Sequence, residues 1–153
     1  MLQAPERLFR STIVVAADLE KVFAFFCDAH NLEKITPESL HFRIIEQTTS
    51  TIEEGTEFEY ALNIHGMPVR WRSRIVDWKP NEQFVDVQLK GPYKRWHHTH
   101  TFEKVENGTR VTDVVRYQLR GGKIADFLVG WWVKRDVAKI FAYREQYIAS
   151  FFT

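Results

Sequence analysis

A series of tight turns constrains the fold of this chain more than any other feature. Six strand-like segments follow one another between residues 42 and 120, separated by short turns rich in Gly, Pro and Asn. A parallel crossover needs about a dozen residues or more, so strands joined by such turns must be antiparallel neighbours. They predict a meandering antiparallel sheet. The segments are 42–48, 56–65, 69–78, 83–90, 95–105 and 109–120.

A further strand and two short helices are expected before these segments, and a long helix after them. Residues 8–15 are rich in β-branched side chains and are typical of a strand. Asp18 and Asp28 are suited to N-cap two short helices, the second ending before Pro37. Residues 123–152 contain no Pro and one Gly. They carry an apolar stripe at helical spacing: Ile124, Phe127, Leu128, Trp131, Ala138, Phe141, Ile148 and Phe151.

One curved sheet wrapped around one long helix is the simplest way to bury the helix stripe and one sheet face together. We therefore predict an α+β helix-grip fold, with a seven-stranded curved antiparallel sheet around a long C-terminal helix and two short helices after the first strand. The chain has 153 residues, 44% of them apolar, and no shift in composition divides it. A single domain over residues 1–153 is expected.

Charge and hydropathy exclude several classes of partner. The chain has 21 Lys and Arg against 20 Asp and Glu, so no global field attracts nucleic acid. Its longest apolar run, 127–133, is far shorter than the roughly 20 residues that cross a bilayer. We expect no integral membrane association. The N-terminus lacks a signal-peptide pattern and Cys27 is the only cysteine, which favours a cytoplasmic protein.

The alternation of side chains assigns an inner and an outer face to the sheet. In the segment 56–65, Phe58 and Tyr60 share an apolar face, which must be the inner one. In the next strand Trp71 lies inside. The outer face then holds an arginine row with acidic neighbours across the strand pair, so we interpret it as a solvated face and not a nucleic-acid site. The residues are Arg70, Arg72, Arg74, Glu57 and Glu59.

The later strands place polar side chains on the same inner face. His98 and His100 alternate in phase with Trp96 and Phe102, and Asp113 and Tyr117 with Val111, Val115 and Leu119. Asp86 joins them if Phe84 points inward, although valines on the other face leave the orientation of that strand open. Polar groups on an inner face either hydrogen-bond to one another or face a cavity. We favour a cavity that orients a mostly apolar ligand.

The same residues also suit other chemistry. Two histidines at i and i+2 with Asp86 or Asp113 resemble a metal-ligand set, but any strand gives this spacing, and we predict no metal and no cofactor. A histidine beside a carboxylate in a dry cavity also suits enolisation, dehydration or aldol closure, with Tyr117 donating to a carbonyl.

Cys27 is expected to be a packed thiol. On the long helix, Arg135 and Arg144 could reach anionic groups of a ligand, but we favour solvated side chains for both.

Several motifs together resemble the START-like (SRPBCC, Bet v 1-like) ligand-binding superfamily, and within it a bacterial polyketide cyclase/dehydrase-like group. They are Ile35-Thr36-Pro37, the run GPYKRWHHTHTFE at 91–103, Gly108-Thr109, DVVRY at 113–117 and IFAYR at 140–144. The resemblance covers nearly the whole chain. It implies a helix-grip fold whose cavity lies between sheet and long helix, with Trp131 or Trp132 near its opening. Members include carriers, receptors and cyclases, so the fold alone does not assign a reaction.

We therefore predict a protein that encloses a hydrophobic or aromatic small molecule, such as a lipid, quinone or polyketide-like compound. Binding is favoured over catalysis. The alternatives are a cyclase, dehydratase or isomerase that uses the His and Asp groups, and an interaction module without a ligand. Homodimerisation stays open, since at most one of Trp131 and Trp132 can point straight into a cavity. The predicted ligand contacts are Phe58, Tyr60, Trp71, Phe84, Asp86, His98, His100, Asp113, Tyr117, Leu128 and Trp131.

Overall fold

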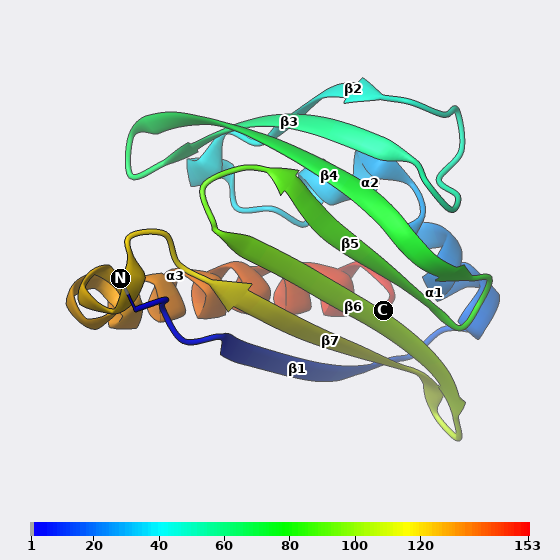
Figure 1. Ribbon diagram of the computed structural model, residues 1–153. Helices are drawn as coiled ribbons and strands as arrows, with labels where there is room; N and C mark the ends of the chain where they lie inside the picture. The colour runs from blue at the N-terminus through cyan, green and yellow to red at the C-terminus, as the bar shows by residue number, and fades with distance from the viewer. Residues whose placement is uncertain (1) are drawn as a thin grey trace.

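The computed structural model describes residues 2–153 and confirms the predicted helix-grip architecture (Figure 1). Strand β1 (Arg7–Val15) leads into helices α1 (Leu19–Phe26) and α2 (Ala29–Lys34) and a 3-10 turn, η1 (Glu38–Leu40). The chain closes with helix α3 (Gly122–Phe151). The remaining strands are β2 (Arg43–Gln47), β3 (Glu57–Ile64), β4 (Met67–Lys79), β5 (Gln83–Lys90), β6 (Arg95–Val105) and β7 (Gly108–Gln118).

All seven strands form one antiparallel sheet in the order β1-β7-β6-β5-β4-β3-β2. Strands β2 to β7 are the meander that the tight turns predict. The N-terminal strand pairs with β7 at one edge, and β2 forms the other edge. Figure 1 shows the sheet curving over α3, with α1 and α2 at one end of the molecule. The inner face of the sheet is therefore covered by helices.

The two predicted N-caps behave differently. The Asp28 carboxylate accepts a hydrogen bond from the backbone N–H of His30 at 2.9 Å, so it caps α2 as expected. Asp18 stands at the N-cap position of α1 in an extended conformation, but its side chain makes no capping hydrogen bond. Only its backbone carbonyl takes part, accepting from Val22 N–H at 3.0 Å.

The apolar stripe predicted along the long helix is only partly buried. Phe141 and Ile148 are 3% and 1% exposed and pack into the core. The earlier part of the stripe is exposed to solvent, as is Phe151 near its end. Figure 1 shows the physical reason, because the first turns of α3 extend past the end of β7. The expectation of one continuous buried stripe was wrong for this half of the helix.

The turn between β6 and β7 depends on a glycine. Gly108 has φ 141°, and a Cβ added there would overlap the backbone carbonyl oxygen of Val15 at the end of β1. We expect Gly108→Ala to lower the free energy of unfolding by about 1–3 kcal/mol, because the variant combines an unfavourable φ with a steric conflict. Urea denaturation measures the change. Gly66→Ala is the matched control: Gly66 has φ 80° but open space around it, so an equal loss in both variants would show that the close approach to Val15 is unimportant.

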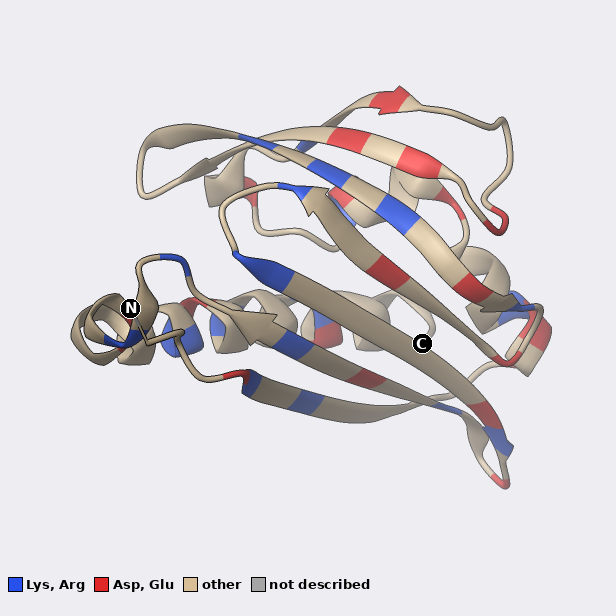
Figure 2. Ribbon diagram, in the orientation of Figure 1, with Lys and Arg blue, Asp and Glu red and all other residues tan. Residues whose placement is uncertain are grey.

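The outer face of the sheet confirms the predicted pairing of arginines with acidic residues. Arg72 Nε and Arg74 Nη2 each lie 2.8 Å from a carboxylate oxygen of Glu57, and Arg70 Nη1 lies 3.0 Å from Glu59. Hydrogen bonds from Arg74 and Arg72 lower the pKa of Glu57. Figure 2 shows the basic positions of β4 running beside the acidic positions of β3. The arginine row is thus matched by acidic residues across the strand pair.

Candidate ligand-binding site

The register of three adjacent strands brings four predicted polar residues together on the inner face. Asp86 on β5 lies opposite His98 on β6, and His100 lies opposite Asp113 on β7. His98, His100 and Asp113 are buried, and Asp86 is partly buried. This placement decides the orientation of β5 that the sequence left open, because Phe84 and Asp86 point inward together. We call the four residues the His–Asp cluster.

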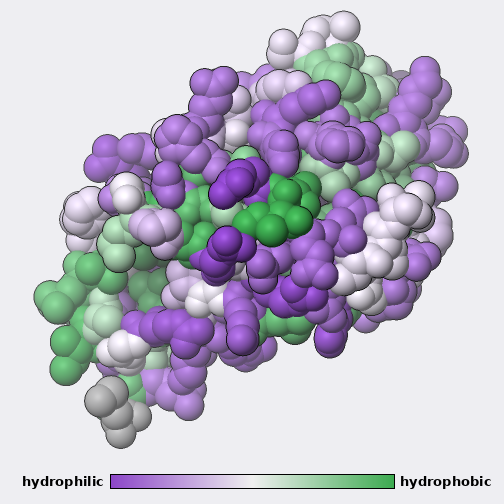
Figure 3. Space-filling view, turned by 90° about the horizontal axis from the view of Figure 1, so that it is seen from above, coloured by the Kyte–Doolittle hydropathy of each residue, from purple (hydrophilic) through white to green (hydrophobic). Residues whose placement is uncertain are grey.

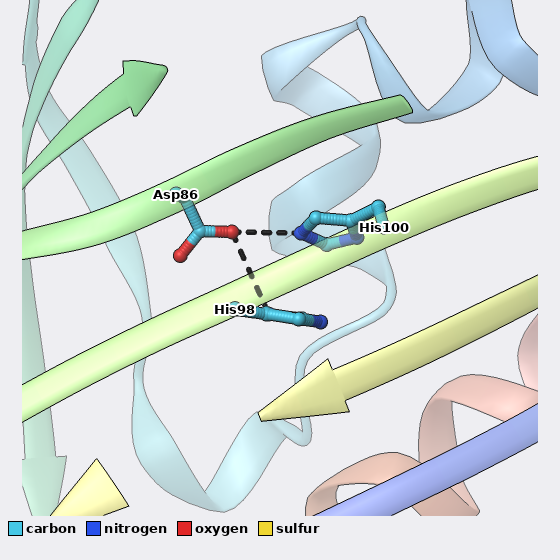
Figure 4. A group of neighbouring side chains, drawn as sticks. All are labelled: Asp86, His98 and His100. Atoms are coloured by element: carbon cyan, nitrogen blue, oxygen red, sulfur yellow. Dashed lines mark hydrogen bonds and ion pairs between the residues drawn. The ribbon is translucent and has the colours of Figure 1, made fainter. Parts of the chain in front are cut away.

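Each histidine of the His–Asp cluster contacts both carboxylates. His100 Nε2 lies 2.7 Å from Asp86 Oδ2, and His100 Nδ1 lies 3.1 Å from Asp113 Oδ1, a close contact without good hydrogen-bond alignment. His98 Nε2 lies 2.8 Å from Asp113 Oδ1, and His98 Nδ1 lies 3.5 Å from Asp86 Oδ2. The imidazole rings stack with centroids 3.7 Å apart. Figure 4 shows both histidines beside the Asp86 carboxylate.

Burial opposes charge on all four side chains, and their mutual contacts decide which groups are ionised. Burial alone would raise the pKa of Asp113, but hydrogen bonds from His100 and His98 outweigh it and hold that pKa well below its usual range. Burial likewise opposes the ionisation of Asp86, and the charge of His98 and the hydrogen bond from His100 lower its pKa. Both carboxylates are therefore ionised near neutral pH.

The two histidines shift in opposite directions. Burial lowers the pKa of His98, and the charge of His100 lowers it further. At His100 burial is overcome by the close contact with Asp113 and the hydrogen bond to Asp86, so its pKa is raised. We infer a neutral His98 beside a protonated His100. A neutral His98 with its proton on Nε2 donates to Asp113, a tautomer that we assign from its contacts.

A buried arginine from α3 completes the charge balance. Arg144 is 8% exposed, and its guanidinium carbon lies 4.9 Å from the centroid of the Phe141 ring. Burial lowers its pKa, while the charges of Asp113 and Asp86 act in the opposite direction. Its Nε makes no hydrogen bond within the described chain. Two carboxylates thus face two cations, protonated His100 and Arg144.

Two members of the His–Asp cluster line a cavity of about 50 Å³ between the sheet, the two short helices and α3. Asp86, His100, Arg144 and Tyr60 contribute polar atoms. The other lining residues are mostly apolar: Phe25, Phe26, Ala29, Asn31, Leu32, Ile35, Ile52, Phe58, Ile75 and Phe84. This volume is enough for one or two water molecules at about 30 Å³ each, whereas small-molecule pockets begin near 300 Å³. A ligand requires the cavity to expand.

A larger hollow of about 310 Å³ lies at the β3–β4 hairpin and the start of β2. Leu62, Val69 and Arg70 are among its lining residues. No member of the His–Asp cluster lines it, and neither does Arg144. The chemistry of the inner face is therefore concentrated at the smaller cavity.

The predicted ligand contacts on the sheet separate into three groups. Five of them line the cavity: Phe58, Tyr60, Phe84, Asp86 and His100. His98 and Asp113 do not line it but contact residues that do. Trp71 and Tyr117 lie in a second aromatic cluster, in which Trp96 lies 5.2 Å from Trp71 and 6.2 Å from Tyr117 between ring centroids.

The expected position of Leu128 and Trp131 is corrected by the structure. Both lie on the half of α3 that extends past the sheet, and their side chains are 62% and 61% exposed. Neither lines the cavity. Helical spacing correctly groups them on one face, but that face points away from the core.

A protein-family model described as "Polyketide cyclase / dehydrase and lipid transport" matches residues 15–142. The chain belongs to this family. Its fold is shared with the Zhui aromatase/cyclase from Streptomyces sp. R1128 (TM-score 0.76, 14% identity, 95% of this chain and 93% of that chain). Two other solved structures are also similar. TTHA0849 from Thermus thermophilus has a TM-score of 0.70 and 19% identity, over 97% of this chain and 100% of that chain. Ginseng major latex-like protein 151 from Panax ginseng has a TM-score of 0.67 and 12% identity, over 97% of this chain and 98% of that chain.

At these identities the solved structures show the fold alone, and no curated protein sequence matches the chain. Family and fold together support a ligand-binding role for this member of the polyketide cyclase/dehydrase and lipid transport family.

Sequence reasoning named Arg144 as able to reach an anionic group of a ligand but favoured a solvated side chain, which was wrong. The signal was present, because position 144 follows Phe141 by three residues and precedes Ile148 by four, on the buried side of the helix. It also missed the cavity wall formed by α1, α2 and the β2–β3 loop, including Phe25, Leu32 and Ile52. No local pattern pairs those segments with the sheet.

Metal binding by the His–Asp cluster and nucleophilic chemistry at Cys27 are two further possibilities that the structure bears on. Ligand atoms of Asp86, His98 and His100 lie within 4.8 Å of one another, so the three could hold a divalent metal. The ring nitrogens of both histidines, however, already contact the Asp86 and Asp113 carboxylates. The present geometry is that of a hydrogen-bonded cluster.

Burial raises the pKa of Cys27 to about 12, so its thiol is protonated near neutral pH and weakly nucleophilic.

Proposed function

We propose that this protein binds a hydrophobic or aromatic small molecule that carries an acceptor oxygen, such as a carbonyl, phenolate or carboxylate. The supporting observation is the Arg144 guanidinium, which lines a largely apolar cavity and has an unpaired, buried Nε. A buried donor without a partner is costly, and an acceptor on the ligand would satisfy it. A lipid, a quinone or a polyketide-like compound each fits this description.

Tyr60 supports the same orientation of the ligand. It lines the cavity with Arg144, and burial raises the pKa of its phenol, so the hydroxyl stays neutral and can donate. The phenylalanines around it provide apolar contact area. A ligand oxygen near Arg144 and Tyr60, with an aromatic or aliphatic body against the phenylalanines, would satisfy both the polar and the apolar lining residues.

Access to the cavity requires a segment to move, and α2 with the β2–β3 loop is the best candidate. Helix α2 has six residues, none of them fully buried. Leu32 of α2 and Ile52 of the loop both form the cavity wall. Segments with few buried contacts open at low free-energy cost. Displacing them would enlarge the cavity without disturbing the sheet.

Binding of two fluorescent probes tests the role of Arg144. Anilinonaphthalene sulfonate is an aromatic anion, and N-phenylnaphthylamine is a neutral compound of similar shape. We expect Arg144→Met to weaken binding of the anion by about 10–100-fold, the range of a hydrogen bond to a charged group, and binding of the neutral probe by about twofold or less. Arg135→Met, an exposed arginine on the same helix, is the matched control.

Equal binding of the anion by wild type and Arg144→Met would contradict the proposal, as would an equal loss in Arg135→Met. Thermal unfolding of each variant checks that the fold is retained. Native mass spectrometry of the purified protein, compared with its denatured mass, would then identify any small molecule that co-purifies. A bound lipid, quinone or aromatic compound supports a carrier.

Acid–base catalysis is a second candidate, favoured by the opposite pKa shifts of the two histidines. Protonated His100 and Asp86 both line the cavity beside Arg144, and His100 Nε2 lies 2.7 Å from Asp86. A substrate carbonyl that displaced Asp86 from His100 would accept the Nε2 proton, and the freed Asp86 carboxylate would take the proton from the adjacent carbon. A cyclase or dehydratase would use such a group. We expect the wild type to accelerate solvent-deuterium exchange at the acidic carbon of a β-diketone, measured by NMR, and His100→Gln to abolish the acceleration. Exchange at the uncatalysed rate in wild type would leave binding as the function.

A further inference from the structure

The first turns of α3 present an apolar face that no part of the described chain covers. Ile124, Phe127, Leu128 and Trp131 follow the i, i+3, i+4, i+7 spacing of one helix face. They are 76%, 83%, 62% and 61% exposed. We call these four residues the α3 apolar face. Figure 3 shows hydrophobic side chains gathered at the end of the molecule where α3 begins. A contiguous apolar patch of this kind marks an interaction surface.

The opposite side of this half-helix is fixed to the sheet. Arg7 on β1 makes a two-pronged ion pair with Asp126, with distances of 2.8 Å and 2.9 Å. Gly130 lies directly against the Arg7 guanidinium, with no room for a side chain. On another flank His65 Nε2 lies 2.7 Å from Asp136, and the His65 ring packs against Trp132. These contacts hold the helix in an orientation that directs the α3 apolar face outward.

The charged side chains of the helical segment that carries the α3 apolar face are mostly positive. Residues 120–139 contain five Lys and Arg and two Asp; Asp126 is in an ion pair with Arg7, and Asp136 hydrogen-bonds to His65. The segment carries +3 while the whole chain carries +1, so the rest of the chain carries −2. Lys123 and Lys134 are about three helical turns apart, which places both on the same flank of the face. Among described residues neither has an ion-pair partner.

We propose that the α3 apolar face docks on the surface of an anionic lipid bilayer. The four apolar side chains would enter the boundary between headgroups and acyl chains, and Lys123 and Lys134 would contact lipid phosphates. An exposed apolar stripe flanked by lysines is the pattern of helices that lie in this interface, and Trp131 is of the residue type enriched there. None of the described helices is long and apolar enough to cross a bilayer, so the association is peripheral.

Charge also decides between a bilayer and a second copy of this chain. Two copies that met through the α3 apolar face would bring lysines of the same sign together, which opposes association. An anionic surface attracts the same lysines. This inference does not depend on a ligand in the cavity, so it can fail or succeed independently of the proposed function.

Vesicle co-sedimentation tests the proposal. The wild-type protein is expected to bind phosphatidylcholine vesicles that contain phosphatidylglycerol, to bind pure phosphatidylcholine at least about tenfold more weakly, and to dissociate as salt is raised. The double variant Lys123→Glu, Lys134→Glu should lose more than about tenfold in partition coefficient. Its matched control, Lys79→Glu with Lys104→Glu, changes net charge equally at exposed positions outside α3 and should stay within about twofold of wild type.

A second pair of variants tests the apolar contribution. Phe127→Ser with Trp131→Ser should abolish binding to the anionic vesicles even at low salt, while circular dichroism shows an unchanged fold, because both side chains are exposed. Tryptophan fluorescence should be quenched by brominated lipid in wild type and much less in Trp131→Phe.

Three results would overturn the proposal. Wild-type protein could fail to bind the anionic vesicles, or the Lys79 and Lys104 control could weaken binding as much as the Lys123 and Lys134 variant. Sedimentation velocity could instead show a dimer that the Phe127 and Trp131 variant dissociates, in which case the face belongs to a second copy.

Discussion

Replacing Asp113 by asparagine is expected to lower the free energy of unfolding by about 3–5 kcal/mol, the cost of breaking a buried charge pair. The substitution keeps the shape of the side chain and removes its charge. Protonated His100 and Arg144 would then share a single, partly buried carboxylate, Asp86. One of them must lose its proton or remain buried without compensation, and either outcome is unfavourable. Urea denaturation at neutral pH measures the loss.

Asp77→Asn is the matched control for this prediction. Asp77 is exposed and has φ 50°, a conformation that asparagine adopts readily, so the same substitution should change stability by about 0.5 kcal/mol or less. The double variant Asp113→Asn, His100→Gln removes one charge of each sign. It should therefore be less destabilised than the sum of the single variants by about 0.5–3 kcal/mol. Additive losses would show that His100 and Asp113 are not coupled.

The fold was predictable because the turns leave few alternatives. Tight turns require antiparallel neighbours, and alternation within β6 and β7 places His98, His100 and Asp113 inside from their apolar neighbours alone. The orientation of β5 could not be settled in this way. Phe84 and Val85 are both buried, at 5% and 2% exposure, so the strand has an apolar residue toward each face and alternation gives no preference.

The long helix shows what a periodic pattern cannot predict. Periodicity identifies residues that share a face, but it does not show whether another element covers that face. The first turns of α3 extend past β7, so Phe127 and Trp131 are exposed, although their spacing matches that of buried Phe141. Arg144 is the converse case, since a charged residue lies on the buried face because carboxylates from β5 and β7 lie near it. Its environment comes from residues distant in sequence.

The two histidines are expected to give the protein a stability maximum near pH 6.5, the value at which both titrate in the unfolded chain. The folded pKa of His98 is lowered, so below pH 6.5 the unfolded chain takes up a proton that folded His98 does not, and stability falls as pH decreases. The folded pKa of His100 is raised, so its stabilising contribution is fully present below pH 6.5. It is lost as pH rises through the folded pKa.

The carboxylates extend the acid limb of this profile. Asp86 and Asp113 have lowered pKa values in the folded state, so their contribution is present above the unfolded value of 3.8 and is lost as pH falls through the folded value. His98 should therefore reduce the free energy of unfolding as pH falls below 6.5, and the two carboxylates should reduce it further below pH 3.8. Urea denaturation across the pH range measures the profile.

Single histidine variants assign each limb of the profile to its residue. His98→Gln should flatten the limb just below pH 6.5, because glutamine cannot take up the proton that unfolded His98 binds. His100→Gln should flatten the limb above it. His30→Gln, at an exposed position on α2, should leave both limbs unchanged. A profile that rises steadily from acid to alkaline pH would contradict a protonated His100, and one that falls steadily would contradict a neutral His98.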